Sequence, residues 1–472
     1  MLLSELQERE RRFKLALRAG IPVLMLTSLV FYALLAQESS FEPTLLNGFL
    51  IAGITFITVY FNYFLIDMSV KESMVDNATQ SFNESVFIEK LHAYKPKTLV
   101  LLVVKNLYII NNNYGAEKVD FLLYTIIHEL NTTLKQFGLQ NPLIGRRYGA
   151  DFLIAIDEDS HNVKEIFESF IEKNKILGGI EVDYVFSAVT NAEGNIDQVL
   201  GQLKDLIVSN IDKKKNNNII KNANELNKQE QDIIDALNQK QFYLDFRPLQ
   251  NTKTKEIEMY EIVSKLVSNE QKKILPRIYL PIINRLNLGI KYDLSLVEYI
   301  VKILPLVDEK ISFTFNLSPF SLRDENFQKE FFELLNIQQI DPSRLTIQLY
   351  ERKTHHDLSG YFKTLTLYRA KGIRICIDNF GSSNASMEYM KHFKFDMMQF
   401  DRDYVTNLED KATFAMLTSL VAMSKELGMQ SVAKWVDNDK QKNKLQSLNI
   451  DYLQGFGIDK HISEQELINR YN

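Results

Sequence analysis

The sequence predicts an α/β protein with three parts: two N-terminal transmembrane helices, an α/β sandwich, and a TIM-like (β/α)8 barrel with one antiparallel strand. Three observations lead to this prediction. Two long uncharged stretches lie near the N-terminus, strand-like and helix-like segments alternate after them, and short apolar runs recur about every 20 to 35 residues in the C-terminal half. With 472 residues and 45% hydrophobic content, the chain can bury more than one core.

The two uncharged stretches predict membrane helices. They are residues 19–35 and 45–66, and each approaches the length that a bilayer core requires. A cleaved signal peptide is the competing interpretation of the first stretch. No small-residue cleavage site leads into a secreted domain, however, and a second apolar stretch follows at once. We therefore expect a two-helix transmembrane hairpin over residues 19–67.

Charged residues on either side of the first span predict its orientation. Arginine and lysine are frequent in residues 1–18, whereas the short connection between the two spans carries only acidic charges. Because positively charged flanks stay inside, segment 1–18 and everything after residue 67 are expected in the cytoplasm. The single cysteine, Cys376, excludes an intrachain disulfide and fits a reducing compartment.

The segment after the second span predicts a connector helix and then an α/β domain. The connector helix is expected over 68–82 and the domain over 83–215, with an amphipathic helix near its centre. A polar run over 216–229 predicts a surface linker to the next domain. The strands of the α/β domain are expected at 98–104, 151–156 and 182–189.

Residues 230–472 predict an eight-stranded barrel. The first two apolar runs lie too close together for a crossover helix, so we expect a hairpin that makes one strand antiparallel. From residue 313 onward, amphipathic stretches separate the runs, as in βα units. The runs begin near residues 242, 257, 313, 345, 373, 396, 431 and 452.

Each predicted barrel strand ends in a polar side chain. The carboxyl ends of barrel strands meet on one face, which is where barrel active sites lie. Loop capping explains any single one of these residues equally well, but the succession predicts a shared cleft. In chain order the residues are Glu261, Asn316, Gln348, Asp378 with Asn379, Gln399 with Asp401, Lys434 and Gln454.

These residues resemble a known family. The ordered pattern over residues 230–472 is similar to the EAL domain of bacterial cyclic di-GMP phosphodiesterases, and the preceding domain resembles a more degenerate GGDEF diguanylate cyclase. The resemblance implies a GGDEF–EAL protein anchored in a bacterial inner membrane, with both termini and both domains in the cytoplasm. The motifs that carry it are "YEIVSKL", "FNLSP", "LTIQLYE", "IDNFGSSNAS", "MMQFD", "SVAKWVD" and "DYLQGFG", preceded by "YGADF" at 148–152.

The EAL-like part departs from the family at its metal site. In the family, acidic residues and one asparagine at the strand ends hold the metal ions, and a lysine orients the attacking water. Here three of the acids and that lysine are lost, and one new lysine is gained. Because a two-metal clamp needs anionic oxygen ligands, we expect no metal binding and no phosphodiesterase activity. The retained positions are Glu261, Asn316 and Asp378, and the degenerate ones are Gln348, Asn379, Gln399 and Lys434.

Lys434 stands where the family has a glutamate. We expect that it takes the place of a cation, pairs with Glu261 or Asp378, and meets a phosphate instead of a metal. The alternative is that Lys434 points to solvent and that the site has drifted. Glu351 and Gln454 match a loop-supporting glutamate and a glutamine of the family.

The GGDEF-like part departs in a similar way. Ala150 and Asp151 take the third and fourth positions of the signature, and Val103 stands where the family has another metal-binding aspartate. One carboxylate is too few for the metals that steer phosphoryl transfer. Asn111 and Asp120 match guanine-reading positions, but they are explained as well as polar residues of a helix surface.

The sequence therefore predicts a catalytically inactive protein that serves a membrane complex as a scaffold or as a cyclic di-GMP effector. Motility, flagellum or biofilm is the process that the family implies, and a homodimer is expected. The alternative is residual phosphodiesterase activity, or modulation of an active partner enzyme. A net charge of −5 argues against nucleic acid, and no cofactor is expected besides cyclic di-GMP as a regulatory ligand. The candidate ligand-binding residues are Arg247, Glu261, Lys265, Asn316, Glu351, Asp378, Lys434 and Gln454.

Overall fold

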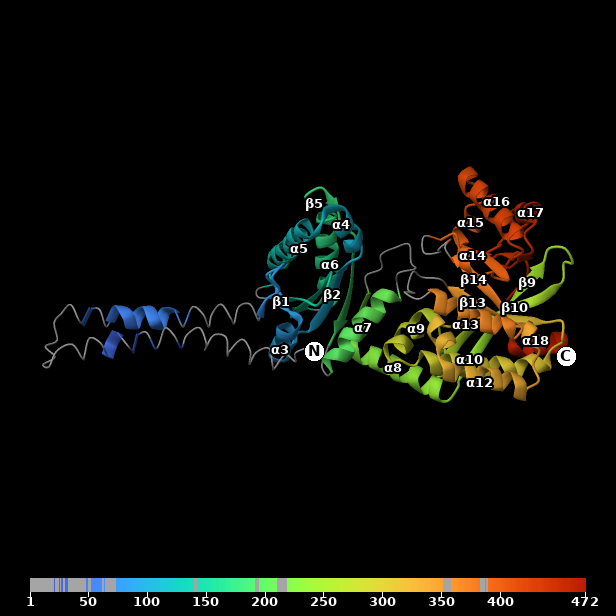
Figure 1. Ribbon diagram of the computed structural model, residues 1–472, viewed down its shortest axis with the longest axis horizontal. Helices are drawn as coiled ribbons and strands as arrows, with labels where there is room; N and C mark the ends of the chain where they lie inside the picture. The colour runs from blue at the N-terminus through green and yellow to red at the C-terminus, as the bar shows by residue number, and fades with distance from the viewer. Residues whose placement is uncertain are drawn as a thin grey trace. The chain divides into compact units, whose positions relative to one another are not determined.

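The computed structural model divides into two compact units, residues 1–225 and 226–472 (Figure 1). It describes residues 74–139, 142–158, 160–191, 195–209, 219–350, 358–382, 387 and 389–472, together with scattered helical positions between 21 and 63.

The predicted transmembrane segments, 19–35 and 45–66, fall largely outside the described residues and stay a prediction. Among the positions that the structure does describe, no helix combines the length and the apolar character that crossing a bilayer requires.

The predicted connector helix over 68–82 does not reach residue 82: Met74 is helical, but the residues after it are not. Val75 and Phe82 form an isolated antiparallel bridge, and the residues between them make a turn. The Asp76 carboxylate accepts hydrogen bonds from the backbone N–H of Thr79 at 2.9 Å and from its hydroxyl at 2.8 Å. Such local side-chain hydrogen bonds offer the backbone an alternative to helical hydrogen bonding. The spacing of apolar residues therefore predicted a helix where the chain forms a turn.

A six-stranded mixed sheet forms the centre of the first unit. Its strands are β1 (Phe82–Asn83), β2 (Thr98–Val104), β3 (Leu143–Arg146), β4 (Asp151–Ile156), β7 (Tyr184–Thr190) and β8 (Ile219–Asn222), and β5 (Ile176–Leu177) and β6 (Ile180–Glu181) form a separate hairpin. The order is β1-β3-β4-β2-β7-β8, with only the outer pairs β1–β3 and β7–β8 parallel. The predicted strands at 98–104 and 151–156 are confirmed, and the third begins two residues later than predicted.

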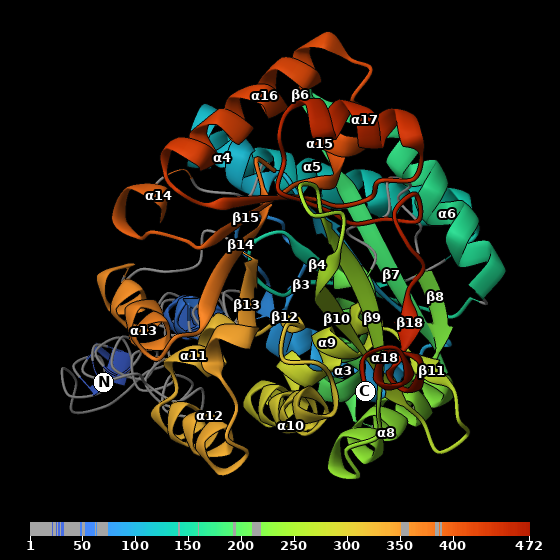
Figure 2. The same ribbon diagram turned by 90° about the vertical axis from the view of Figure 1, so that its right-hand side faces the viewer.

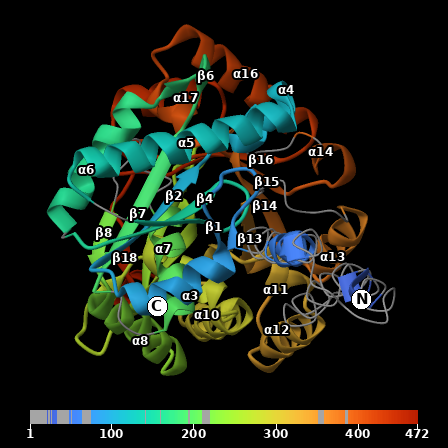
Figure 3. The same ribbon diagram turned by 90° about the vertical axis from the view of Figure 1, so that its left-hand side faces the viewer.

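Helices cover both faces of this sheet, with α5 and α6 on one side and α3 and α7 on the other (Figure 3). On the first side, Ile126 and Phe167 pack against Leu102 and Phe152 in one buried cluster. Because both faces are covered, the central strands read as continuous apolar runs. The helices are α3 (Glu84–Tyr94), α4 (Leu107–Tyr114), α5 (Ala116–Gln136), α6 (Ser160–Lys173) and α7 (Ile196–Val208).

The predicted linker over 216–229 contains the boundary between the two units, after residue 225, but its described part is regular secondary structure. Residues 219–222 form β8, which pairs in parallel with β7, and α8 (Ala223–Asn238) follows at once. The polar composition of this segment suggested a linker because β8 is an edge strand and because α8 exposes a polar face. The opposite face of α8 buries Leu226, Ile233 and Leu237 at helical spacing.

The second unit is the predicted barrel (Figure 2). Its strands are β9 (Phe242–Asn251), β10 (Ile257–Val267), β12 (Ser312–Asn316), β13 (Leu345–Tyr350), β14 (Arg374–Phe380), β15 (Met397–Phe400), β16 (Gln430–Ala433) and β17 (Tyr452–Leu453). The seven strands from β10 to β17 run parallel in that order, and β9 closes the ring antiparallel to both β10 and β17. The predicted hairpin with one antiparallel strand is therefore confirmed.

The barrel helices lie around the strands and pack on their outward-facing side chains, including Phe313, Ile347 and Ile375. A smaller cluster, to which Met259, Met397 and others contribute, fills part of the interior. The remaining strands are β11 (Lys273–Ile274) and β18 (Ile462–Ser463), and the helices are α9 (Pro276–Arg285), α10 (Gly289–Ile303), α11 (Pro319–Arg323), α12 (Glu325–Ile337), α13 (Leu358–Ala370), α14 (Tyr389–His392), α15 (Arg402–Thr406), α16 (Lys411–Glu426), α17 (Asp439–Ser447) and α18 (Glu464–Tyr471).

Gly145 offers a test of packing in the first unit. A Cβ at this position of β3 would lie 2.7 Å from Phe87 Cδ2 on α3, which is closer than carbon atoms pack. We predict that Gly145→Ala lowers local stability by about 1–3 kcal/mol. Hydrogen exchange measured by mass spectrometry should then show faster exchange in β3 and α3. Gly289→Ala is the matched control, because its Cβ would have no neighbour nearer than 3.7 Å. Unchanged protection of β3 in Gly145→Ala would contradict this packing.

Candidate functional site

Polar side chains converge at the carboxyl end of the barrel strands, and we call this group the mouth cluster. Most of its members are buried, and the strand register brings them together although they are far apart in the sequence. The members are Arg247 on β9, Glu261 on β10, Asn316 on β12, Gln348 on β13, Asp378 on β14, Gln399 on β15, Lys434 directly after β16 and Gln454 directly after β17.

The Lys434 ammonium group lies between two carboxylates. Its Nζ is 2.7 Å from Glu261 Oε1 and 3.6 Å from Asp378 Oδ1. The Lys434 side chain is only 11% exposed, so the alternative that it points to solvent is wrong. Opposite charges that are buried together attract strongly, and removal of one partner leaves the other unpaired and desolvated.

The charges of this group set each other's protonation. Burial opposes the charged form of every member. For Glu261, the nearby Lys434 and Arg247 outweigh burial, and its pKa lies below the ordinary value. For Lys434, the two carboxylates outweigh burial, and its pKa lies above the ordinary value. For Asp378, burial prevails over the attraction of Lys434, so its pKa is raised. Asp378 is therefore the member that takes up a proton more readily than an ordinary aspartate.

Three amide side chains form a hydrogen-bonded row that ends at Asp378. Asn316 Nδ2 donates to Gln348 Oε1 at 3.2 Å, and Gln348 Nε2 donates to Gln399 Oε1 at 3.2 Å. Gln399 Nε2 then donates to Asp378 Oδ1, which also accepts from the backbone N–H of the next residue at 2.8 Å. Each amide N–H donates to the next group of the row, and the last one donates to the carboxylate. Neutral amides therefore stabilise one negative charge.

The two other predicted cations already contact carboxylates. Arg247 Nη1 lies 3.7 Å from Glu261 Oε2. Lys265 contacts Asp245, and its Nζ lies 5.4 Å from the centre of the Tyr243 ring. The hairpin register explains both placements, because Arg247 is opposite Glu261, whereas Lys265 is four residues further along β10 and opposite Tyr243. Lys265 therefore lies on the same face of β10 as Glu261, nearer the carboxyl end of the strand, and its ammonium group is paired with Asp245.

Three further predicted positions have different outcomes. Asn379 adopts a φ of +52°, a left-handed conformation that asparagine tolerates. Asp401 caps α15, since its carboxylate accepts from the backbone N–H of Asp403 at 2.9 Å, so loop capping is the right interpretation there. Glu351 lies outside the described residues.

The sequence interpretation missed three aromatic residues near the mouth cluster. Trp435 and Phe456 are 40% and 67% exposed, and they follow Lys434 and Gln454 by one and two residues. The His461 ring stacks on Phe456 with 5.0 Å between ring centres. Burial, followed by the nearby Arg247, lowers the pKa of His461. Their position in the sequence, directly after the polar residues that end β16 and β17, could have indicated that Trp435 and Phe456 lie near the site.

A buried carboxyl supports the loop after β12. Asp293 Oδ2 on α10 accepts a hydrogen bond from the backbone N–H of Ser318 at 3.0 Å, two residues beyond Asn316. Burial raises the pKa of Asp293 to about 6. This carboxyl thus helps to position Asn316 and titrates in a mildly acidic range.

The corresponding positions of the first unit lie on neighbouring strands. Val103 of β2 is opposite Asp151 of β4. Asp151 Oδ2 lies 3.4 Å from Lys204 Nζ on α7, and burial raises the pKa of Asp151. Asn111 and Asp120 are exposed on α4 and α5, as expected of helix-surface residues.

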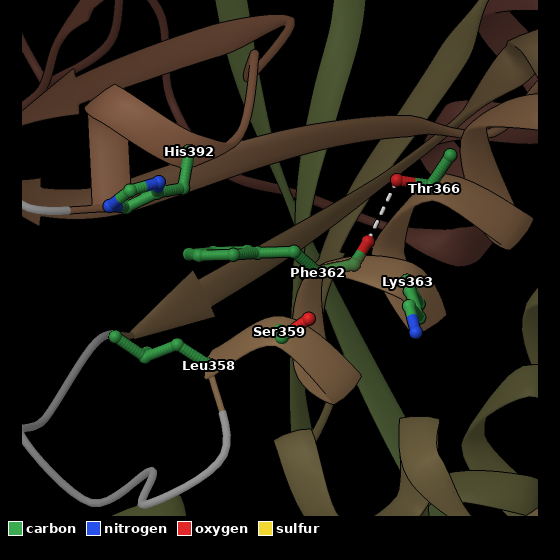
Figure 4. A pocket seen from close by; sticks show the side chains of 6 residues that line it. All are labelled: Leu358, Ser359, Phe362, Lys363, Thr366 and His392. Atoms are coloured by element: carbon green, nitrogen blue, oxygen red, sulfur yellow. Dashed lines mark hydrogen bonds between the residues drawn. The ribbon is translucent and has the colours of Figure 1, made fainter.

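A pocket of about 560 Å³ lies on α13 and α14 (Figure 4). The Phe362 ring faces His392 across it, with 6.2 Å between ring centres. No member of the mouth cluster lines this pocket, so we assign it no part in the site. Its lining residues are Leu358, Ser359, Phe362, Lys363, Thr366 and His392.

We predict that Lys434→Met lowers the stability of the barrel by about 3–5 kcal/mol at pH 7.5, because it leaves buried carboxylates without their cation. The loss should shrink as the pH falls toward 5, because in the variant the carboxyls no longer have the lysine charge beside them, and protonation removes their unpaired negative charge. In the wild type, by contrast, the contribution of Glu261 is lost only as the pH falls through its lowered pKa. Denaturant unfolding followed by the emission of Trp435, the one tryptophan of the chain, measures this.

The matched control is the double variant Lys434→Met with Glu261→Gln, which removes both members of the closest pair and should recover part of the loss. A loss that stays the same between pH 5 and pH 7.5 would contradict the ion pair.

A second prediction concerns Asp293, whose folded-state pKa of about 6 exceeds the ordinary 3.8. The folded state therefore binds the proton more tightly than the unfolded state, so ionised Asp293 opposes folding above about pH 6. Asp293→Asn keeps an oxygen for Ser318 and should gain about 1–3 kcal/mol at pH 7.5. The gain should fade as the pH drops from 6 toward 4 in the same unfolding assay. An equal gain at pH 4.5 would rule out titration of Asp293 as the cause.

Comparison with known proteins identifies the second unit. Residues 230–461 match the family described as the EAL domain. The probable cyclic di-GMP phosphodiesterase PdeA of Escherichia coli (strain K12) is 26% identical over 232 residues, which are 48% of this chain and 31% of that protein. The cyclic di-GMP phosphodiesterase PdeF of the same organism is 26% identical over 241 residues, 50% of this chain and 32% of that protein. The chain thus spans about a third of the length of these relatives.

Among solved structures, "Vibrio cholerae LapD S helix-GGDEF-EAL (bound to c-di-GMP)" is similar with a TM-score of 0.63, covering 84% of this chain and 98% of that chain. At 16% identity, this similarity concerns the fold alone. Almost the whole of the second unit therefore matches the EAL domain family.

Proposed function

We propose that this chain is a catalytically inactive GGDEF–EAL protein, in which the EAL domain binds cyclic di-GMP at the mouth cluster and acts through protein contacts. One observation carries the proposal. Lys434 is buried between Glu261 and Asp378, at positions where the family resemblance implies metal ions.

The mouth cluster does not fit a pair of divalent metal ions. Hydrolysis of a phosphodiester by a two-metal clamp needs several anionic oxygens in strict geometry. The cluster has two carboxylates, Glu261 and Asp378, and Lys434 contacts both of them. A dication at either carboxylate would lie beside the lysine charge and repel it. The hydrogen-bonded row that ends at Asp378 consists of neutral amides, which add no anionic ligand. We therefore assign no hydrolytic step to these residues.

A phosphate diester is the ligand that the cluster supports without metal. Lys434 and Arg247 balance the charges of Glu261 and Asp378, so the ionised cluster is neutral. Because the pKa of Asp378 is raised, an approaching anion favours its protonation, and this leaves one net positive charge facing the ligand. Cyclic di-GMP is the diester named for the related phosphodiesterases and for the LapD chain that shares this fold.

The wider setting belongs to the same proposal. Two N-terminal spans over 19–35 and 45–66 would anchor the chain in a bacterial inner membrane, with both termini and both domains cytoplasmic. The first unit would be a degenerate GGDEF domain, in which Asp151 is paired with Lys204 instead of serving a metal. A receptor without chemistry acts through contacts, so a membrane complex of motility, flagellum or biofilm is the proposed partner, with the chain as a homodimer.

Calorimetric titration of the purified full-length chain with cyclic di-GMP, in Mg²⁺ and then in EDTA, tests the proposal. We expect the affinity for cyclic di-GMP to be equal in both buffers. We also expect no hydrolysis of cyclic di-GMP to a linear dinucleotide. Lys434→Met should weaken binding by about tenfold or more, the worth of a hydrogen bond to a charged group. Lys363→Met, which changes an exposed lysine of α13, is the control and should bind as the wild type does.

Binding that requires Mg²⁺, or hydrolysis of the ligand, would favour a residual phosphodiesterase instead. Absence of heat at high ligand concentration would leave the chain as a scaffold without a nucleotide ligand.

A further inference from the structure

The one tryptophan of the chain occupies a strained position beside the mouth cluster. Trp435 directly follows Lys434 and has a φ of +67°. A bulky L-residue with positive φ is a genuine outlier, because its Cβ approaches the following carbonyl oxygen. Such strain persists only where surrounding structure over-determines it, and it gathers at functional sites.

Backbone contacts of the next loop hold Trp435 in this conformation. The backbone N–H of Val436 donates to the Gln454 carbonyl at 3.0 Å, and the N–H of Gly457 donates to the Val436 carbonyl at 2.8 Å. At Gly455, an added Cβ would lie 2.2 Å from the Val436 carbonyl oxygen. The loops after β16 and β17 are therefore pressed together, and Trp435 has no room to relax.

Burial of the ring does not explain the strain. Trp435 remains 40% exposed, and the Arg402 guanidinium lies 4.5 Å from its ring centre. Arg402 follows β15 and Lys434 follows β16, and these strands are parallel neighbours. The indole is thus held at the carboxyl end of the barrel, on the loop that directly follows Lys434, and part of its surface is exposed.

A second exposed ring lies on the loop that clamps Trp435. Phe456 follows Gly455, is 67% exposed, and has its own stacked support in His461, at an interplanar angle of 23°. Two aromatic rings, each backed by a cationic or heteroaromatic side chain, consequently follow the buried lysine and the glutamine of the cluster.

We propose that Trp435 is a base-stacking residue, with Phe456 as a second platform, and that the ligand of the mouth cluster is a nucleotide whose base stacks on the indole. This inference rests on the proposed function, because it concerns the ligand of the same site. An aromatic ring accepts the π-face of any base, and an arginine next to it adds attraction for the phosphate. A bare phosphate uses the lysine but gains nothing from either ring.

The single tryptophan makes this directly measurable in the purified full-length chain. Cyclic di-GMP should quench the Trp435 emission to saturation, with the same midpoint as the calorimetric titration. GMP should also quench it, whereas inorganic phosphate should leave the emission unchanged. Equal quenching by inorganic phosphate would overturn the stacking role.

Substitution separates stacking from a structural role, because the two predict opposite changes in stability. Trp435→Gly removes the ring and relieves the left-handed strain, so Tm should rise by roughly 2–4 °C. Affinity for cyclic di-GMP should fall on the order of tenfold or more, the usual effect of losing a stacked base contact. Trp435→Phe should restore most of the affinity without the rise in Tm. A tryptophan needed only for folding would instead lower Tm when replaced by glycine.

The matched control is Gln339→Gly, which relieves a φ of +51° at the end of α12. It should raise Tm and leave the affinity unchanged. If the wild type binds cyclic di-GMP by calorimetry but Trp435→Gly binds it equally well, the stacking inference is overturned and the receptor proposal stands. If the wild type gives neither heat nor quenching with cyclic di-GMP or GMP, both proposals are overturned.

Discussion

Lys434 and Glu261 reach each other across 173 residues of sequence, and their buried ion pair organises the carboxyl end of the barrel. Neither charge is stable there alone, because burial opposes both. Lys434 keeps Glu261 ionised and also faces Asp378 at 3.6 Å. The row of amides then completes the solvation of Asp378 from the other side. The positive and negative charges of this site balance without a metal ion, which is the physical basis of the receptor proposal.

In both units, a carboxylate at a position that the family resemblance links to metal binding is paired with a lysine. In the barrel, Glu261 pairs with a lysine, and in the first unit Asp151 lies 3.4 Å from Lys204. In each case a lysine occupies the surroundings of an acid that the family resemblance links to metal. A lysine adds one charge at a fixed distance and cannot activate water as a metal does. If both sites lack chemistry, as proposed above, ligand binding and protein contacts are the ways in which such a chain acts.

The strained tryptophan and the ion pair are consecutive residues, and their geometry is linked. The hydrogen bonds that clamp the loop after β16 fix the backbone that carries both Lys434 and Trp435. On the stacking proposal, a ligand that contacts Lys434 would also contact the indole of the next residue. A left-handed backbone at a bulky residue lowers the stability of the folded state. Such strained residues are found mainly at functional sites.

Local pattern was sufficient for the barrel. Short apolar runs, their spacing and the polar residue after each run predicted the strands, the antiparallel hairpin and most of the mouth cluster, because strand ends of a barrel must meet on one face. Where local and tertiary forces competed, the pattern failed. Residues 219–222 read as a polar linker but form an edge strand against β7, and Asp76 turns a helix-like segment into a tight turn. Only the tertiary structure decided that Lys434 is buried against Glu261, that Lys265 pairs with Asp245, and that Trp435 is strained. Those outcomes depend on which strands become neighbours and which loops press together, and no short stretch of sequence contains both partners.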